Sequence, residues 1–228
     1  MDRSPVLLKT IVNWNWVRLH LDDIIWPALW QHIQIAVISV ALAVAISLPL
    51  GVLVSRYRAL YPPVMFFTGL LYTIPSLALF AVLITVPGIG LGRRPAIIAL
   101  VAYSLLILIR NVVTGIDSVP RETREAARGM GMTSRQILWR IELPLAIPVI
   151  VAGVRIAAVS TIGIATIAAY IGAGGLGGLI RDGISRGQST RIVVGGALAV
   201  LLSVAAELAL LGMERRLRPW ERRARRAA

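Results

Sequence analysis

Few side chains in this 228-residue sequence are of a type that could carry out chemistry. The sequence contains no cysteine, which excludes disulfides, thiolate nucleophiles and metal sites with cysteine ligands. Its two histidines, His20 and His32, lie before or at the edge of the first long apolar segment, where an interfacial or packing role is commoner than metal binding. There is no glycine-rich loop ending in Lys-Ser or Lys-Thr to hold nucleotide phosphates. We therefore expect no catalytic residue, no metal and no cofactor in this chain.

The most informative polar residues lie in one stretch, EAARGMGMTSRQILWRIELP, which runs from Glu125 to Pro144 between two apolar segments. Before it, Pro120 is suited to start a helix, and the acidic and basic residues of that helix have spacings at which they can pair: Glu122, Arg124, Glu125 and Arg128. Ala126 and Ala127 give this helix a narrow face that another protein could approach closely. The composition would also suit a long connector without a partner.

Glycines are expected to divide this stretch into two helices. Gly129 and Gly131 allow a sharp turn, after which a second short helix is expected at 134–141. Pro144 is then expected to restart the chain as a membrane helix. A short polar segment held at both ends by membrane helices is suited to transmit a rigid-body movement.

The elements that hold these residues are expected to be apolar helices. The chain is 57% hydrophobic and 15% charged, with a mean hydropathy of +0.78, which is too apolar for an ordinary soluble domain. Apolar stretches of about 20 residues recur, and backbone hydrogen bonding in lipid makes each a helix. The predicted fold class is all-α, a polytopic transmembrane bundle of about five spans within a permease-like domain at 31–213. We predict the spans at 31–54, 62–86, 95–113, 144–171 and 192–213, with a cytoplasmic segment at 120–142.

Three features of the spans and their flanks stay open at this level. Residues 1–30 contain Trp14, Trp16, Trp26 and Trp30 among mixed neighbours, which suits an interfacial segment and a packed extension equally. Pro75 interrupts the second span and is expected to kink or split it. Residues 214–228 form a basic tail suited to binding anionic lipid or to fixing orientation.

Arginines set the expected topology, since basic residues near span ends favour the cytoplasmic side. Arg56, Arg58, the region 121–140 and the C-terminal tail are then cytoplasmic, and five spans put the N-terminus outside. Arg93 and Arg94, together with the arginines at 181–191, depart from this rule. The net charge of +13 is interpreted as a topology signal and not as a nucleic-acid surface, because the basic residues form no face interleaved with aromatic residues.

Polar residues inside the spans are the candidates for a translocation pathway. Arg155 lies inside the fourth span, where a charged residue costs roughly 2.5–3.5 kcal/mol. It could have a structural role, pairing with Glu207 or reaching backbone carbonyls, or a functional one, lining the pathway or contacting a carboxylate. The other candidates carry hydroxyl groups, which also hold helices together: Tyr103, Ser160, Thr161 and Thr166. The tryptophans avoid the span centres, so we expect no aromatic cage for a quaternary ammonium group in this chain.

The polar stretch resembles a known signature. Glu125-Ala126-Ala127, three residues, Gly131, nine residues, Ile141, one residue and Leu143-Pro144 are similar to the EAA signature of permease subunits of bacterial ABC importers. The segments TIPSLALFAVL, GIGLGRRPAIIALVAYSLLILIRN and IGAGGLGGLI are similar to the branch that imports glycine betaine, choline, carnitine and proline. The resemblance implies a type I ABC importer permease fold in the bacterial inner membrane. It also implies that the signature residues couple the chain to an ATPase.

The resemblance implies partners as well. These are a dimer of ATPase subunits that holds ATP and magnesium, a second permease subunit in a homo- or heterodimer, an extracytoplasmic substrate-binding protein and membrane lipid, with no nucleic acid. The chain would be a transporter subunit and not an enzyme. We expect lysine at Glu125, or a bulky residue at Gly131, to weaken ATPase docking without disturbing the fold. The runner-up substrate is methionine or another amino acid. A secondary transporter or channel that acts alone is a distant alternative, since we find no paired repeats.

Overall fold

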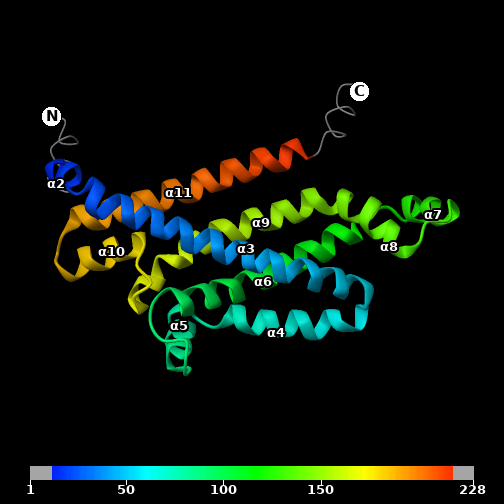
Figure 1. Ribbon diagram of the computed structural model, residues 1–228, viewed down its shortest axis with the longest axis horizontal. Coiled ribbons are helices and arrows are strands. Elements are labelled where there is room, and N and C mark those ends of the chain that lie inside the picture. Colours follow the sequence, from blue (N-terminus) through cyan, green and yellow to red (C-terminus); the bar gives the residue numbers. More distant parts are fainter. Residues whose placement is uncertain (1–11, 218–228) are drawn as a thin grey trace, which may run out of the picture. The chain divides into compact units, whose positions relative to one another are not determined.

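The computed structural model describes residues 12–217, and these residues form helices and turns without a strand. The all-α prediction is therefore confirmed. Figure 1 shows the order of the elements along the chain. They are α2 (Trp14–Leu19), the π-turn η1 (Leu21–Ile25), α3 (Trp26–Arg56), the 3-10 turn η2 (Arg58–Leu60), α4 (Tyr61–Thr73), α5 (Ser76–Thr85), α6 (Arg93–Asp117), α7 (Arg121–Gly129), α8 (Ser134–Ile137), the π-turn η3 (Leu138–Glu142), α9 (Leu143–Ala165), the 3-10 turn η4 (Ile167–Ile171), α10 (Leu176–Ser185) and α11 (Ser189–Arg216).

Four helical runs among the described residues are long and apolar enough to cross a membrane: Leu21–Arg56, Arg93–Asp117, Ser134–Ala165 and Ser189–Arg216. They correspond to the first, third, fourth and fifth predicted spans. The predicted end of the fourth span, at residue 171, is wrong because α9 stops at Ala165. The 3-10 turn η4 follows, and the left-handed backbone of Gly172, with φ of 79°, ends the helical path.

The second predicted span, 62–86, is not one straight helix. α4 and α5 are bent by 96° relative to one another. Pro75 precedes α5 with an extended backbone, ψ being 134°. A proline ring removes one backbone donor and disfavours the helical conformation of the residue before it, so Pro75 splits the span instead of merely kinking it.

The membrane helix expected to start at Pro144 begins as α9 at Leu143, but it is not separated from the helix before it. The chain from Ser134 to Ala165 is one helical run that passes through α8, η3 and α9. At the end of η3 the Leu143 N–H donates to the Leu138 carbonyl, one residue further back than in an α-helix. This wider turn accommodates Pro144, which has no N–H to donate, close to the start of α9. The predicted short helix at 134–141 is therefore the beginning of the fourth membrane helix.

The predicted segment at 1–30 ends earlier than expected. α3 begins at Trp26, so Trp26 and Trp30 belong to the first membrane helix, whereas Trp14 and Trp16 lie on the short helix α2. Residues 1–11 of this segment lie outside the described residues. The same holds for residues 218–228 of the predicted tail at 214–228, of which residues 214–216 form the last turn of α11.

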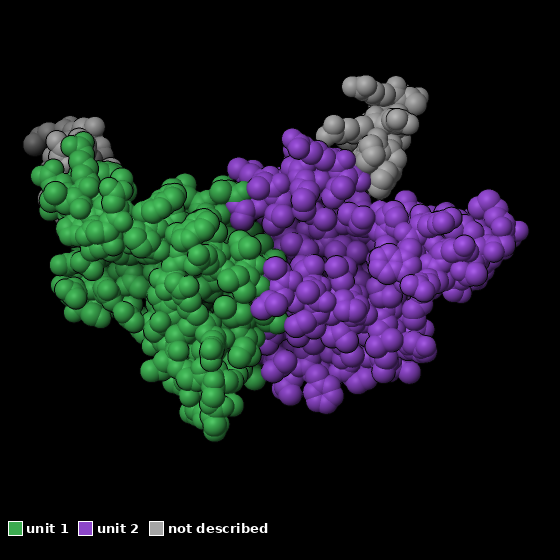
Figure 2. Space-filling model, in the orientation of Figure 1, with its two compact units in different colours: residues 1–40, 74–101, 158–205 green, residues 41–73, 102–157, 206–228 purple. Residues whose placement is uncertain are grey.

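The chain forms two compact units, coloured separately in Figure 2. Within the described residues, unit 1 comprises 12–40, 74–101 and 158–205, and unit 2 comprises 41–73, 102–157 and 206–217. In unit 2, α3, α6 and α9 pack around a cluster of Val112, Ile116, Ala146 and Ile150. Gly51 allows α3 to approach α6 closely, because a Cβ at this position would lie 2.5 Å from Val112 Cγ1.

Unit 1 is held together by α10 and by the glycine cluster at 172–175. Leu176 and Leu179 of α10 pack against Ala199 of α11. Gln31 of α3 donates from Nε2 to the Ala173 carbonyl at 3.0 Å and accepts from the Gly175 N–H at 3.1 Å. The glycine cluster therefore has a packing role within unit 1, in which its backbone pairs with a side chain of α3.

Candidate functional site

Helix α7 carries the first part of the signature. Glu122 lies in its first turn and Arg128 in its last, which matches the direction of the helix dipole. Ala127 is only 1% exposed, whereas Glu125 and Ala126 are exposed. Ala127 thus packs α7 against the rest of unit 2, and Glu125 and Ala126 remain accessible to a partner.

The charge pairing predicted within α7 is wrong. No ion pair joins two residues of this helix, which the structure describes throughout. Arg124 instead lies with Nε 3.0 Å from Glu142 Oε1. Its Nη2 donates to the Ile116 carbonyl at 2.5 Å, near the C-terminal end of α6. Arg124 therefore ties α7 to two other helical segments of unit 2.

The turn from α7 to α8 depends on one of the two glycines. The Gly131 N–H donates to the Arg128 carbonyl at 2.9 Å, and the Met132 N–H donates to the Ala127 carbonyl at 3.1 Å. Gly131 has a left-handed backbone with φ of 80°, so residues 127–132 form a Schellman turn. Gly129 is the last residue of α7 and has no positive φ.

Helix α8 starts with a capping box. Thr133 Oγ1 accepts from the Gln136 N–H at 3.3 Å, and Gln136 Oε1 accepts from the Thr133 N–H at 2.8 Å. Both donors would otherwise have no partner at the helix start. The connection between α7 and α8 is thus a defined turn, which makes the link between α7 and the fourth membrane helix short and stiff.

Glu142 is the residue of this site that the sequence analysis missed. Its side chain is 3% exposed, and it lies in η3 between Ile141 and Leu143. Oε2 accepts from Arg56 Nη2 at 2.5 Å, while Oε1 faces Arg124. One carboxylate therefore joins α3, α7 and the base of α9. A signal existed, because a carboxylate flanked by apolar residues at the start of a span must find a cationic partner.

The last residues of the signature have unequal surroundings. Ile141 and Leu143 are half-buried, and Pro144 is exposed. Leu143 also lines an apolar groove together with Leu138 and Trp139. The signature is therefore not a single surface: Glu125, Ala126, Gly131 and Pro144 are exposed, and the other residues are buried or partly buried in unit 2.

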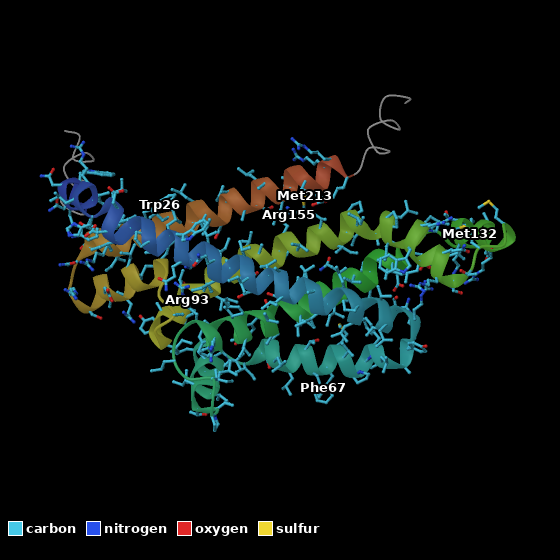
Figure 3. The ribbon with its side chains drawn as sticks, in the orientation of Figure 1. Trp26, Phe67, Arg93, Met132, Arg155 and Met213 are labelled. Atoms are coloured by element: carbon cyan, nitrogen blue, oxygen red, sulfur yellow. The ribbon has the colours of Figure 1, made fainter. Side chains whose placement is uncertain are left out.

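Arg155 has carboxylate partners in unit 2. Its Nη1 forms an ion pair with Glu207 Oε1, and its Nε lies 3.5 Å from Glu214 Oε2. Figure 3 shows Arg155 of α9 near Met213 of α11. This closeness is expected, because Met213 directly precedes Glu214. The predicted pairing with Glu207 is confirmed. The charge of Arg155 thus holds two membrane helices together.

The remaining pathway candidates fall in both units. Tyr103 of unit 2 is buried, and its ring meets Tyr72 edge to face with centroids 6.0 Å apart. In unit 1, Thr161 is buried, Ser160 is half-buried, and Thr166 donates from Oγ1 to the Gly163 carbonyl at 2.7 Å. A hydroxyl group that donates to a backbone carbonyl of a neighbouring turn, as that of Thr166 does, does not by itself define a translocation pathway.

Metal binding finds no support in the part of the chain that is described. No group of three His, Asp or Glu side chains there could hold an ion. His32 is fully buried in unit 1, with Nε2 3.1 Å from the Ile162 carbonyl, and His20 Nδ1 lies 2.9 Å from the Trp16 carbonyl. Both histidines therefore have structural contacts.

Comparisons with known proteins identify relatives of this chain. The osmoprotectant import permease protein OsmW of Salmonella typhimurium is 47% identical over 176 residues, which cover 76% of this chain and 81% of that protein. The glycine betaine/carnitine/choline transport system permease protein OpuCD of Bacillus subtilis is 43% identical, with 83% and 82% covered.

Solved structures resemble the fold as well. A chain of the MetNI methionine ABC transporter in an inward-facing conformation matches with a TM-score of 0.75 and 25% identity, covering 85% of this chain and 96% of that one. A chain of an amino acid ABC transporter matches with a TM-score of 0.67 and 17% identity, and covers 83% and 92%. Residues 43–222 match the family described as binding-protein-dependent transport system inner membrane component, and the chain belongs to this family.

Proposed function

We propose that this chain is the transmembrane permease subunit of an ATP-driven importer of osmoprotectants such as glycine betaine, choline, carnitine or proline. Two relatives named for osmoprotectants or for glycine betaine, carnitine and choline, at 47% and 43% identity, support this substrate class. Methionine is the runner-up, since a chain of a methionine transporter has the same fold at 25% identity.

Coupling to a separate ATPase is proposed for α7. The supporting observation is the exposure of Glu125 and Ala126 on a helix that is fixed from both ends. One end is fixed by the Schellman turn at Gly131, and the other by the contacts of Arg124 with Glu142 and with the end of α6. A helix fixed in this way passes a displacement to α3 and α9 instead of absorbing it.

The assembly would supply what this chain lacks. ATP and magnesium would be held by a pair of ATPase subunits, and recognition of substrate by an extracytoplasmic binding protein. A second permease subunit, the same or related, would complete the pathway, since closed symmetric pairs are the commonest arrangement. Our candidates for the translocation pathway stay the same: Tyr103, Arg155, Ser160, Thr161 and Thr166. Arg155 would take part while paired with Glu207.

Docking of α7 is tested with Ala126→Trp, because Ala126 is exposed and a large ring there meets the partner and not the fold. We expect the purified variant to keep its thermal stability and to lose most substrate-stimulated ATP hydrolysis with the ATPase. Gln188→Trp, a change at an exposed residue of unit 1, is the matched control. Normal stimulated hydrolysis by Ala126→Trp would contradict the docking role of α7.

The substrate is tested separately by calorimetry on the cognate binding protein. Tight binding of a quaternary amine or proline supports the osmoprotectant class, and binding of methionine alone selects the runner-up. Transport by the purified chain in liposomes without ATPase would instead support a secondary transporter.

A further inference from the structure

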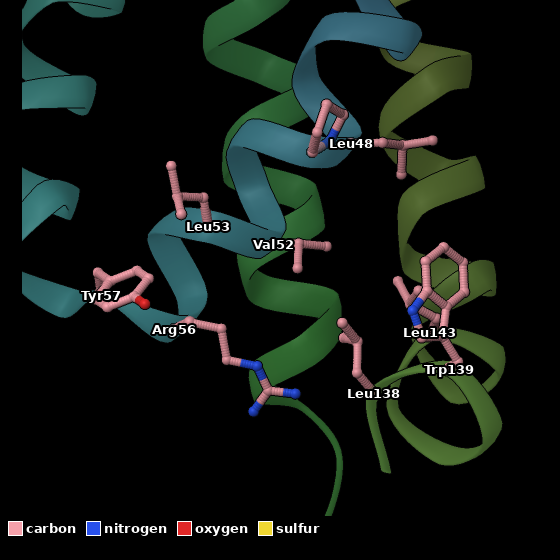
Figure 4. A pocket seen from close by; sticks show the side chains of 9 residues that line it. Leu48, Val52, Leu53, Arg56, Tyr57, Leu138, Trp139 and Leu143 are labelled. Atoms are coloured by element: carbon pink, nitrogen blue, oxygen red, sulfur yellow. The ribbon is translucent and has the colours of Figure 1, made fainter. Parts of the chain in front are cut away.

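Unit 2 contains an apolar groove to which the proposed coupling helix α7 contributes no residue, and which Leu143 alone of the signature residues lines. Figure 4 shows it between the second half of α3 and the junction of η3 with α9. Its volume is about 450 Å³. One wall belongs to α3 and includes Leu48, Val52 and Arg56, followed by Tyr57, and the other wall includes Trp139 and Leu143. The lining is apolar except near the end that holds Arg56. Both walls belong to helical runs that are long and apolar enough to cross a membrane, so a lipid chain is a chemically suitable occupant of the groove.

The polar end of the groove has a surplus of positive charge. Arg56 and Arg124 both pair with the single carboxylate of Glu142, so these three side chains carry a net charge of +1. Arg56 uses Nη2 for Glu142, and its side chain is still 35% exposed. The neighbouring Arg58 is already paired with Asp117. Arg56 therefore has donors left for an anionic group.

Aromatic residues mark the depth of this end. Tyr57, which follows Arg56 directly at the end of α3, is 63% exposed, and Trp139 of η3, on the other wall, is 62% exposed. Such side chains concentrate at the headgroup level of a bilayer. Leu48 lies eight residues before Arg56 on α3, about 12 Å deeper at the rise of an α-helix. The groove thus has a cationic mouth at headgroup level and an apolar floor at acyl-chain level.

We propose that this groove binds an anionic phospholipid, with the phosphate on the Arg56 guanidinium and one acyl chain along Val52 and Leu48. A zwitterionic lipid could also place its phosphate on Arg56, but it would add an ammonium group, so the net positive charge at the mouth would remain. An apolar helix of another protein would fill the floor but would desolvate Arg56 without pairing it, which is costly. An anionic phospholipid satisfies both ends of the groove.

Trp139 reports on the occupant. We would replace the other five tryptophans with Phe, assemble the chain with its ATPase in lipid bilayers, and measure quenching of Trp139 by brominated acyl chains. The bilayers contain equal phosphatidylglycerol and phosphatidylcholine, with the bromine on one lipid or the other. We expect phosphatidylglycerol to occupy the groove about fivefold in preference, since one basic residue near an anionic surface is worth about 1 kcal/mol. Equal quenching by the two lipids, or none by either, overturns the proposal.

Matched variants assign the effect to the groove. Arg56→Gln should bring the preference close to one, while Arg110→Gln, which removes an exposed arginine of α6 that does not line the groove, should preserve it. Val52→Phe fills the groove without touching an ion pair and should reduce quenching by both lipids, whereas Val37→Phe, at an exposed position of α3 outside the groove, should not. If the tryptophan replacements prevent assembly, native mass spectrometry of the otherwise unaltered transporter measures retained phosphatidylglycerol. Equal retention by the Arg56 and Arg110 variants then contradicts the proposal.

Discussion

Among the side chains of unit 2, Glu142 is the one whose charge we expect to matter most for folding. It is buried and faces Arg56 and Arg124, so neutralising it leaves two partly buried cations without their carboxylate. Removing one partner from a buried ion pair is strongly destabilising. We expect Glu142→Gln to lower the free energy of unfolding by about 3 kcal/mol. Denaturation of the purified chain in mixed micelles, followed by circular dichroism, measures this change.

Two further variants separate charge from general damage. Glu122→Gln removes an exposed carboxylate of α7 and should change stability by no more than about 0.5 kcal/mol. Glu142→Asp keeps the charge on a shorter side chain that reaches one arginine better than two, so its loss should be intermediate. If Glu142→Gln and Glu122→Gln have the same free energy of unfolding, the ion pairs of Glu142 contribute nothing to the stability of the fold.

At the scale of elements, the turn between α7 and α8 gives a prediction from a pair of glycines. Gly131 has φ of 80° and Gly129 is helical, and a Cβ added to either would meet no atom within 4 Å. Both positions therefore have room for a Cβ atom, and they differ only in backbone conformation. We expect Gly131→Ala to destabilise the chain by about 1–2 kcal/mol, and Gly129→Ala to stabilise it by up to about 1 kcal/mol. The same denaturation experiment compares them.

Gly131→Asn completes this comparison. Asparagine tolerates the left-handed region better than alanine, so its loss should be the smaller of the two. If alanine and asparagine at position 131 lower the free energy of unfolding equally, the left-handed backbone of Gly131 is not the reason for the loss of stability. The expectation that a bulky residue at Gly131 would spare the fold is not supported by this backbone, and Ala126 is the better probe of docking.

The elements also show which parts of the fold the sequence could predict. Long apolar runs predicted the membrane helices, since a crossing helix needs only length and hydropathy. The break at Pro75 was predicted only as a kink or a split, because local chemistry does not fix the angle. The continuous run through Pro144 was missed, because the wider turn of η3 allows a proline near the start of α9 without a break, and the residue pattern alone does not reveal such a turn. Likewise Arg124 has local partners at suitable spacing, yet a buried carboxylate 18 positions later attracts it.

At the scale of the whole molecule, the contacts of unit 2 predict how often the chain crosses the membrane. Arg56 at the end of α3 pairs with Glu142 at the base of α9, and Arg124 joins Glu142 to the end of α6 near Ile116. These ends therefore share one side. α6 is 25 residues long, about 37 Å at the rise of an α-helix, so its other end at Arg93 lies on the opposite side. We therefore predict that residues 57–92 cross the membrane once, with the broken pair α4–α5 as a crossing and not a re-entrant loop.

Because the sequence has no cysteine, this prediction can be tested with single cysteines without removing any native thiol. We expect Leu91→Cys and Gln188→Cys, both exposed, to react with a membrane-impermeant maleimide in intact cells whose outer barrier is opened. Met130→Cys, after α7, should react only once the inner membrane is permeabilised, as basic residues near α7 favour the cytoplasm. Labelling of Leu91→Cys on the same side as Met130→Cys would mean that α4–α5 turns back within the membrane. It would also mean that α6 fails to cross, which its length and hydropathy argue against.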